Sequence, residues 1–204
     1  MDLSETTETT VTTRVIRPFK IIATILVVIA IILMIPVLVS YVWIQAQTYH
    51  QGLWIECYSG LRIVPTNGPG EPTPSTSSEI KCYGAQPSGW LKAAEAFTII
   101  SLVLSVFGLL CALLALWKGK QYAIYFTIGG VLLIFSALCI LIVLIIFPVK
   151  FMVEEVVPGR GVWELGWAWG LALGILVIQL VSGLLYIFAP DREEIYYSEK
   201  TYFS

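Results

Sequence analysis

The sequence predicts an all-α membrane protein, a four-transmembrane-helix bundle that carries a small extracellular antiparallel β-sheet. Of the 204 residues, 57% are hydrophobic and only 13% are charged, whereas a soluble domain has about 25% charged residues. Apolar residues at this density cannot all be buried in one small core. Four long runs also lack a charged residue, at 21–55, 96–117, 121–149 and 165–190. Each run contains the roughly 20 apolar residues that a helix needs to cross a bilayer.

The four runs are expected to form helices, because backbone groups in hydrocarbon must find their hydrogen bonds within the same segment. The expected helices span 19–42, 93–117, 121–147 and 165–189. The first run is too long for the apolar region of a cleavable signal peptide. Pro148 is expected to end the third helix, because proline has no N–H to donate and its ring clashes with the preceding turn.

Basic residues near the expected membrane ends predict the orientation, because Lys and Arg are enriched on the cytoplasmic side. They precede the first helix or flank the turn between the second and third: Arg14, Arg17, Lys20, Lys118 and Lys120. Four crossings return the chain to its starting side, so both termini are expected in the cytoplasm of a plasma-membrane protein. The expected parts are tails at 1–18 and 190–204, a membrane domain at 19–189, and extracellular loops at 43–92 and 148–164.

Two of the four cysteines, Cys57 and Cys82, lie in the first extracellular loop. In an oxidising compartment they have one partner each, which predicts a disulfide. Closing a loop of about 25 residues would stabilise the fold by about 3 kcal/mol. Cys111 and Cys139 lie within the second and third helices, where a free thiol behaves as a small hydrophobic group. One histidine and two cysteines outside the membrane do not make a four-ligand zinc site, so no metal or cofactor is expected.

Segments rich in β-branched residues, on both sides of the two loop cysteines and in the second loop, predict a small antiparallel sheet that combines both extracellular loops. The expected strands are 42–50, 53–58, 61–64, 79–83 and 150–157. Segment 65–78 is rich in Pro, Gly, Ser and Thr and is expected to be a mobile loop. The first 13 residues, rich in Thr and Glu, are expected to be a disordered tail.

The first extracellular loop carries a recognisable order of residues. They are Trp43, Gly52, Leu53, Trp54, Cys57 and Cys82. This order resembles the W-GLW-C-C signature of the claudin superfamily, which includes claudins, peripheral myelin and epithelial membrane proteins, and calcium-channel gamma subunits. Stretches at 17–20, 147–151 and 167–171, together with the short spacing from Trp43 to Gly52, are similar to the transmembrane protein 47 and PERP branch.

The sequence departs from the claudin pattern at three places. The interval from Cys57 to Cys82 is longer than the usual one in the family, by the insert rich in Pro, Ser and Thr. Claudins usually have an arginine at the entrance of the second helix, where this chain has Glu95. The chain ends at Ser204, without the hydrophobic C-terminal residue that PDZ domains bind. Contacts with cytoplasmic junction scaffolds are therefore expected not to use a PDZ-binding C-terminus.

Small residues predict how the helices pack, because close backbone approach drives helix association in lipid. The fourth helix has a ridge of Gly166, Gly170 and Gly174. The second helix has a small-residue face of Ser101, Ser105, Gly108, Ala112 and Ala115. These two faces are expected to meet inside the protomer, or one of them to make a lateral contact between protomers. Gln179, near the middle of the fourth helix, is expected to make an interhelical or self-directed hydrogen bond.

The resemblance implies an integral membrane protein of cell–cell junctions, which organises adhesion or a barrier through lateral and trans contacts with itself or related tetraspans. The candidate contact residues in the two loops are Gln45, Gln47, Tyr49, His50, Met152, Glu154 and Glu155. Tyr196 and Tyr197 follow acidic residues in the C-terminal tail and are candidate phosphorylation sites.

Two alternative functions stay open: a paracellular ion channel or barrier former, and an auxiliary, gamma-like subunit of an ion channel or receptor. The sequence has no nucleophile motif, P-loop or cluster of catalytic residues, so an enzyme is not expected. A net charge of −2 leaves no basic surface for nucleic acid. The lipid bilayer is the one partner that composition alone predicts.

Overall fold

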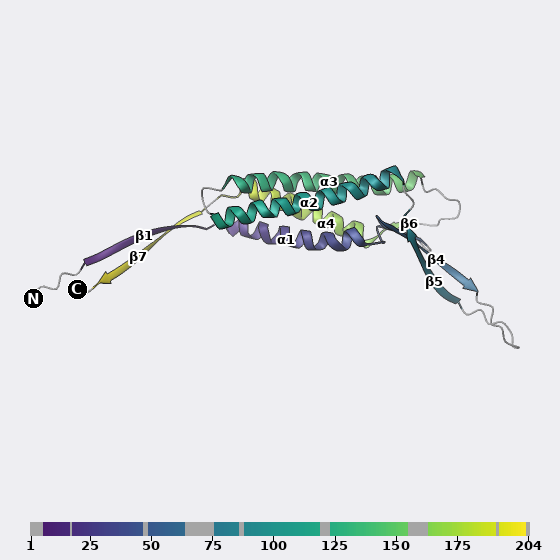
Figure 1. The fold of residues 1–204 in the computed structure, drawn as a ribbon, viewed down its shortest axis with the longest axis horizontal. Coiled ribbons are helices and arrows are strands. Elements are labelled where there is room, and N and C mark those ends of the chain that lie inside the picture. The colour runs from purple at the N-terminus through teal and green to yellow at the C-terminus, as the bar shows by residue number, and fades with distance from the viewer. Residues whose placement is uncertain are drawn as a thin grey trace, which may run out of the picture.

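A computed structural model of the chain describes residues 6–16, 18–46, 49–63, 76–85, 88–118, 123–154, 163–190 and 192–202. A helical bundle forms its centre, a five-stranded sheet lies at one end, and a two-stranded ribbon made from the two tails lies at the other (Figure 1). The N- and C-terminal tails therefore leave the bundle at the same end, opposite the five-stranded sheet.

The four membrane-spanning helices predicted from the sequence are present. They are α1 (Pro18–Val39), α2 (Gly89–Lys118), α3 (Ile124–Glu154) and α4 (Trp167–Phe188). All four are long and apolar enough to cross a bilayer. Large apolar side chains such as Phe107, Leu113 and Val181 stay exposed on the bundle surface, which is where a membrane protein contacts lipid.

Pro148 does not end the third helix, so this prediction is wrong. Helix α3 contains Pro148 and continues to Glu154. Phe147 and Phe151, four residues apart on one helix face, are both buried on the two sides of the proline. Their burial favours a continuous helix over the loss of one backbone hydrogen bond. The prediction of a strand at 150–157 is therefore wrong for residues up to Glu154. Residues 155–157 lie outside the described part of the chain.

The five-stranded sheet confirms that both long loops contribute to one antiparallel sheet. Its strands run in the order β5-β4-β3-β2-β6. They are β2 (Ile44–Ala46), β3 (Tyr49–Gln51), β4 (Ile55–Ile63), β5 (Thr76–Gly84) and β6 (Trp163–Leu165). The strand from the second loop is thus β6. The two strands expected at 53–58 and 61–64 form the single strand β4, because β5 pairs with it along its whole length. Most of segment 65–78 lies outside the described residues.

The two tails pair with each other. Strand β1 (Thr6–Ile16) lies antiparallel to β7 (Arg192–Tyr202). The prediction that the first 13 residues form a disordered tail is therefore wrong from Thr6 onward. The threonines that suggested disorder are β-branched and favour strands when a partner strand is available. Tyr196 and Tyr197 lie in β7, opposite Thr12 and Val11.

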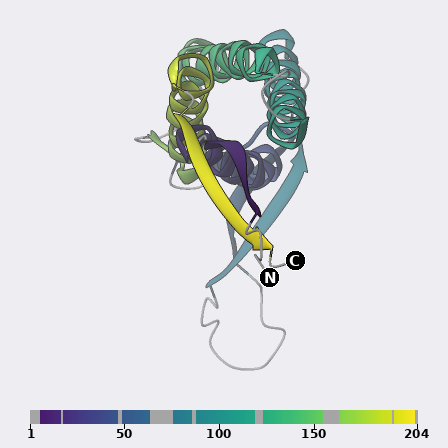
Figure 2. The same cartoon turned by 90° about the vertical axis from the view of Figure 1, so that its left-hand side faces the viewer.

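The helices are arranged around a common axis, and α2 and α4 stand diagonally across it (Figure 2). Helix α2 packs on α3, where a Cβ added to Gly129 would lie 2.9 Å from the Gly108 carbonyl oxygen. Helix α3 packs on α4 through Gly130 and Gly183, where a Cβ added to Gly130 would lie 2.8 Å from the Gly183 carbonyl oxygen. The expectation that the small-residue faces of α2 and α4 meet inside the protomer is therefore wrong.

The small-residue face of α2 is buried all the same, against α3. Its members Ser101, Ser105, Gly108, Ala112 and Ala115 are all buried. Gly170 and Gly174 of α4, by contrast, have nothing within 4 Å of an added Cβ. These two glycines lie on the outside of the protomer, so only the lateral half of the packing hypothesis stays open.

A buried polar cluster joins three helices in the centre of the bundle. Ser136 of α3 donates to the Ser101 carbonyl at 2.7 Å and lies 2.8 Å, Oγ to Oγ, from Ser105. From the diagonal helix, Gln179 Nε2 donates to Ser105 Oγ at 2.8 Å. The interhelical hydrogen bond expected for Gln179 is thus present. Each such bond in a membrane contributes only about 0.6 kcal/mol on average, so the cluster fixes the register of the helices more than it stabilises them.

Candidate functional site: the five-stranded sheet and its attachment

The tryptophans of the sequence signature attach the sheet to the end of α1. Trp43 is fully buried, and its indole N–H donates to the Val37 carbonyl at 3.0 Å. The indole N–H of Trp54 donates to the Leu38 carbonyl at 2.8 Å. The last carbonyl groups of a helix have no partner within the helix, and these two indoles satisfy two of them. Sequence reasoning identified both tryptophans but missed this capping role.

The glycine of the GLW triplet lies where no side chain fits. A Cβ added to Gly52 would overlap the carbonyl oxygen of Ser40 and approach the backbone of Tyr41. Its neighbour Leu53 is fully buried. The signature glycine therefore permits the turn after β3 to lie directly on the chain that leaves α1.

Gly166 makes the corresponding contact for the second loop. Its N–H donates to the Trp43 carbonyl at 2.8 Å, and an added Cβ would overlap the carbonyl oxygen of Val42. Gly166 precedes α4 as its N-cap residue. Its assignment to a helix-packing ridge with Gly170 and Gly174 is therefore wrong, because it packs on the segment between α1 and β2.

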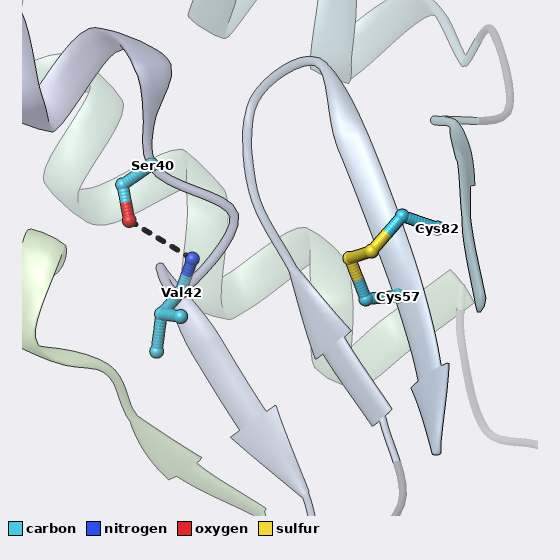
Figure 3. Close-up of a disulfide and its surroundings, with 4 residues drawn as sticks. All are labelled: Ser40, Val42, Cys57 and Cys82. Atoms are coloured by element: carbon cyan, nitrogen blue, oxygen red, sulfur yellow. Dashed lines mark hydrogen bonds between the residues drawn. A yellow bond between two sulfur atoms is a disulfide. The ribbon is translucent and has the colours of Figure 1, made fainter. Parts of the chain in front are cut away.

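The disulfide predicted between Cys57 and Cys82 is present. Figure 3 shows it bridging β4 and β5, where the two cysteines stand directly opposite each other in register. Cys57 is fully buried, while Cys82 is exposed on the outer strand of the sheet. The bond thus fixes the distal strand β5 to the part of the sheet that the signature residues hold on the bundle.

Aromatic rings run from the bundle along one face of the sheet. Tyr49 is buried, with its ring centroid 6.2 Å from Phe151 and 5.0 Å from Tyr58. The Tyr58 ring in turn lies 6.4 Å from the Tyr83 ring. Tyr58 and Tyr83 are 41% and 56% exposed. The row therefore begins in the core and ends as exposed aromatic surface on β4 and β5.

The candidate contact residues do not form one surface. Tyr49 is an interior residue, because it is buried and its hydroxyl oxygen lies 3.1 Å from Gln51 Oε1 and 3.2 Å from Glu56 Oε2; its choice as a contact residue is wrong. Gln45 and His50 are half-buried and stand opposite each other in register. Met152 is exposed on the last turn of α3, and Glu154 ends that helix. Gln47 and Glu155 lie outside the described residues.

The exposed end of the sheet consists of residues that sequence reasoning had not chosen. Ile80, at the middle of β5, is 59% exposed, and the register places it on the opposite face of the sheet from Tyr58 and Tyr83. A strand at 79–83 was expected from the sequence, but a strand pattern does not reveal whether a strand lies at the edge of its sheet. That position follows from the pairing order.

Charges on the described part of the sheet are of both signs. Glu56 and Lys81 lie on neighbouring strands, and Glu164 lies on β6. Among the described residues, no group of three His, Cys, Asp or Glu side chains could hold a metal ion. The sheet therefore offers a mixed polar and aromatic contact surface.

These features define a class of protein: a tetraspan whose two loops build one disulfide-linked sheet, capped onto the first helix by two tryptophans. Residues 21–188 match the family model described as "PMP-22/EMP/MP20/Claudin tight junction", and the chain belongs to this family. Members of the family are structural membrane proteins, which makes a structural role the starting point here.

Two curated relatives illustrate the similarity. The chain is 27% identical, over 172 residues covering 82% of each chain, to "p53 apoptosis effector related to PMP-22" from Danio rerio. It is 26% identical to "Epithelial membrane protein 3" from Rattus norvegicus over 121 residues, which cover 58% of this chain and 72% of the relative. The resemblance to the claudin superfamily is thus confirmed.

Proposed function

We propose that the protein is a structural component of cell–cell contacts in the plasma membrane, with both termini in the cytoplasm. In this orientation it presents the five-stranded sheet to the extracellular space. The sheet acts as a contact surface for copies of the same chain or for related tetraspans. The observation that carries the proposal is the combination of rigid attachment and exposed apolar surface. Trp43 and Trp54 hold the sheet on the bundle and the disulfide joins β5 to β4, while Tyr58, Ile80 and Tyr83 stay exposed on these two strands.

The physical reason is that an immobile aromatic surface binds at a lower entropic cost than a flexible loop. Large exposed apolar side chains outside the membrane are also typical of protein contact sites. A paracellular channel gains less support, because Glu56, Lys81 and Glu164 give no field of one sign that would select ions. No feature of the described residues favours a pore-forming partner over another copy.

Imaging tests this proposal. Cells that express a tagged copy are grown together with cells that do not, and both carry a second, unrelated membrane marker. The protein should be enriched, relative to the marker, at borders between two expressing cells and not at borders with a non-expressing cell. An even distribution over the whole surface, with the same ratio at every border, would contradict a role in contacts.

Lateral contacts in the membrane give a second prediction, because Gly170 and Gly174 form an open face on α4. Gly170→Leu should leave the folded yield unchanged, since nothing lies within 4 Å of its Cβ. It should reduce lateral complexes, because close approach of a neighbouring helix requires small residues. The measurement is the protomer count of single complexes in the membrane by stepwise photobleaching. Val103→Leu, at an exposed position of α2, is the matched control, and an unchanged count for Gly170→Leu would rule out a lateral role for this face.

A further inference from the structure

The inner face of α4 carries three buried polar side chains on successive turns: Gln179, Ser182 and Tyr186. Residues three and four apart lie on one face of a helix, so the three form a row along the bundle axis. At one end of the row, Gln179 Nε2 donates to Ser105 Oγ of α2 at 2.8 Å. At the other end, the Tyr186 hydroxyl donates to Thr24 Oγ1 of α1 at 2.9 Å. The row therefore begins and ends at hydrogen bonds to two other helices.

Two oxygen atoms in the middle of this row make no hydrogen bond to any described residue. They are Oε1 of Gln179 and Oγ of Ser182, and both residues are fully buried. A buried polar atom without a partner costs free energy, because it has lost its hydrogen bonds to water. In native proteins such atoms are nearly always satisfied, often by an ordered water molecule. These two oxygens therefore indicate a bound group between them.

Ser182 differs from other buried hydroxyl residues of the bundle. The hydroxyls of Thr24, Thr98 and Ser105 each donate at 2.8 Å to the carbonyl group four residues earlier in the same helix. This is the usual way for a hydroxyl to be satisfied inside a helix. Ser182 makes no such bond. Its hydroxyl is therefore available to a partner that does not belong to its own backbone.

The dimensions of the site fit one small molecule. Cβ atoms three residues apart on a helix are separated by about 5–6 Å, and two hydrogen bonds that meet at one oxygen atom span up to about 5.6 Å. Helices α2 and α4 both run from the sheet towards the tails (Figure 1). On the buried face of α2, Gly108 and Ala112 follow Ser105 just as Ser182 follows Gln179. These two residues have almost no side chain, so they take up little of the axis at this level.

We propose that one water molecule is bound inside the bundle between Gln179 and Ser182. It accepts a hydrogen bond from the Ser182 hydroxyl and donates one to Gln179 Oε1, which gives it the two polar partners that a buried water needs. A cation fits less well, because an unpaired charge is costly to bury. Among the described residues, no group of three His, Cys, Asp or Glu side chains could hold one. The water joins Ser182 to the central serine cluster, and it is independent of any contact made by the sheet.

NMR of the full chain in lipid nanodiscs tests for the water directly. The side-chain amide signal of Gln179 is identified by its loss in Gln179→Met. In the original chain this amide should show cross-relaxation with a water proton, although the residue is buried. Ser182→Ala should abolish the cross-relaxation, because one remaining partner does not hold a buried water, and should keep the amide signal. An original chain without the water contact, or a Ser182→Ala variant that retains it, would overturn the proposal.

Stability gives a second test, in which the sign of one effect is decisive. Removing a hydroxyl that has no partner would leave the fold equally stable or more stable. Removing one that binds the water should raise the unfolding equilibrium constant about threefold, the size of an average hydrogen bond in a membrane protein. The measurement is a titration of Ser182→Ala with denaturing detergent. A variant at least as stable as the original chain would contradict the bound water.

A double-mutant cycle shows whether Gln179 and Ser182 share one partner. Gln179→Met also loses the bond to Ser105, so it should raise the unfolding constant about tenfold. Adding Ser182→Ala should raise it no further, because the water is already lost, whereas independent losses would give about thirtyfold. Thr98→Val is the matched control, since Thr98 bonds to its own helix, and its effect should multiply with that of Gln179→Met. A product of about thirtyfold for the Ser182 pair as well would rule out a shared water.

Discussion

Gly52→Ala should prevent the five-stranded sheet from docking on the bundle. The added Cβ would overlap the carbonyl oxygen of Ser40 and the backbone of Tyr41, and backbone atoms cannot rotate away as a flexible side chain can. Overpacking of this kind typically costs about 1–3 kcal/mol, and we expect the upper end of that range. Because Trp54 follows two residues later, a displaced turn would also draw its indole away from the Leu38 carbonyl. The expected result is a large loss of protein at the cell surface, measured by surface biotinylation.

Gly170→Ala is the matched control for this variant. Its Cβ meets nothing within 4 Å, and alanine in a helix is more stable than glycine by roughly 0.5–1 kcal/mol. Surface levels should therefore equal or exceed those of the original chain. If Gly52→Ala reached the surface as well as Gly170→Ala and had the same thermal stability in detergent, the close packing at Gly52 would be refuted.

Removing the disulfide should have the second large effect. Cys57→Ser or Cys82→Ser opens a link across 25 residues, which is worth about 3 kcal/mol on the chain-entropy model. The loss falls mainly on β4 and β5, because β5 contacts no other strand of the described sheet. The expected result is faster proteolysis between β4 and β5 and a lower melting temperature for the purified protein.

Cys111→Ser and Cys139→Ser serve as controls, since both residues are free, half-buried cysteines. They should leave proteolysis of the sheet unchanged. The double variant Cys57→Ser with Cys82→Ser should resemble either single variant, because no partner thiol is left to form a wrong link. Single variants that resist protease as well as the original chain does would show that the backbone pairing of β4 and β5 suffices without the bond.

Several features of this protein could be predicted from local sequence because local composition determines them. A run of about 20 apolar residues must span the membrane as a helix whatever its neighbours are. The disulfide followed from two cysteines in one loop, and the central hydrogen bond of Gln179 followed from placing an amide in hydrocarbon. None of these conclusions required knowing which helices touch.

The errors about the helices have a common cause. Helices that are apolar on all sides show no periodicity, so the sequence does not reveal which face meets which neighbour. Gly170 and Gly129 both lie in apolar helices, but only Gly129 meets another helix within the protomer. Proline usually breaks a helix, but α3 continues through Pro148, where Phe147 and Phe151 are buried on its two sides.

The sequence by itself determined the number of spans, the antiparallel sheet built from both loops, and the covalent link within it, because each depends on run length, composition and residue type. Only the tertiary structure decided that Gly52 and Gly166 pack on the chain leaving α1, that Tyr49 is an interior residue, and that β5 is an end strand of the sheet in the described part of the chain. These facts depend on contacts between segments far apart in the chain, and the free energy of such contacts comes from the assembled shape rather than from any segment alone.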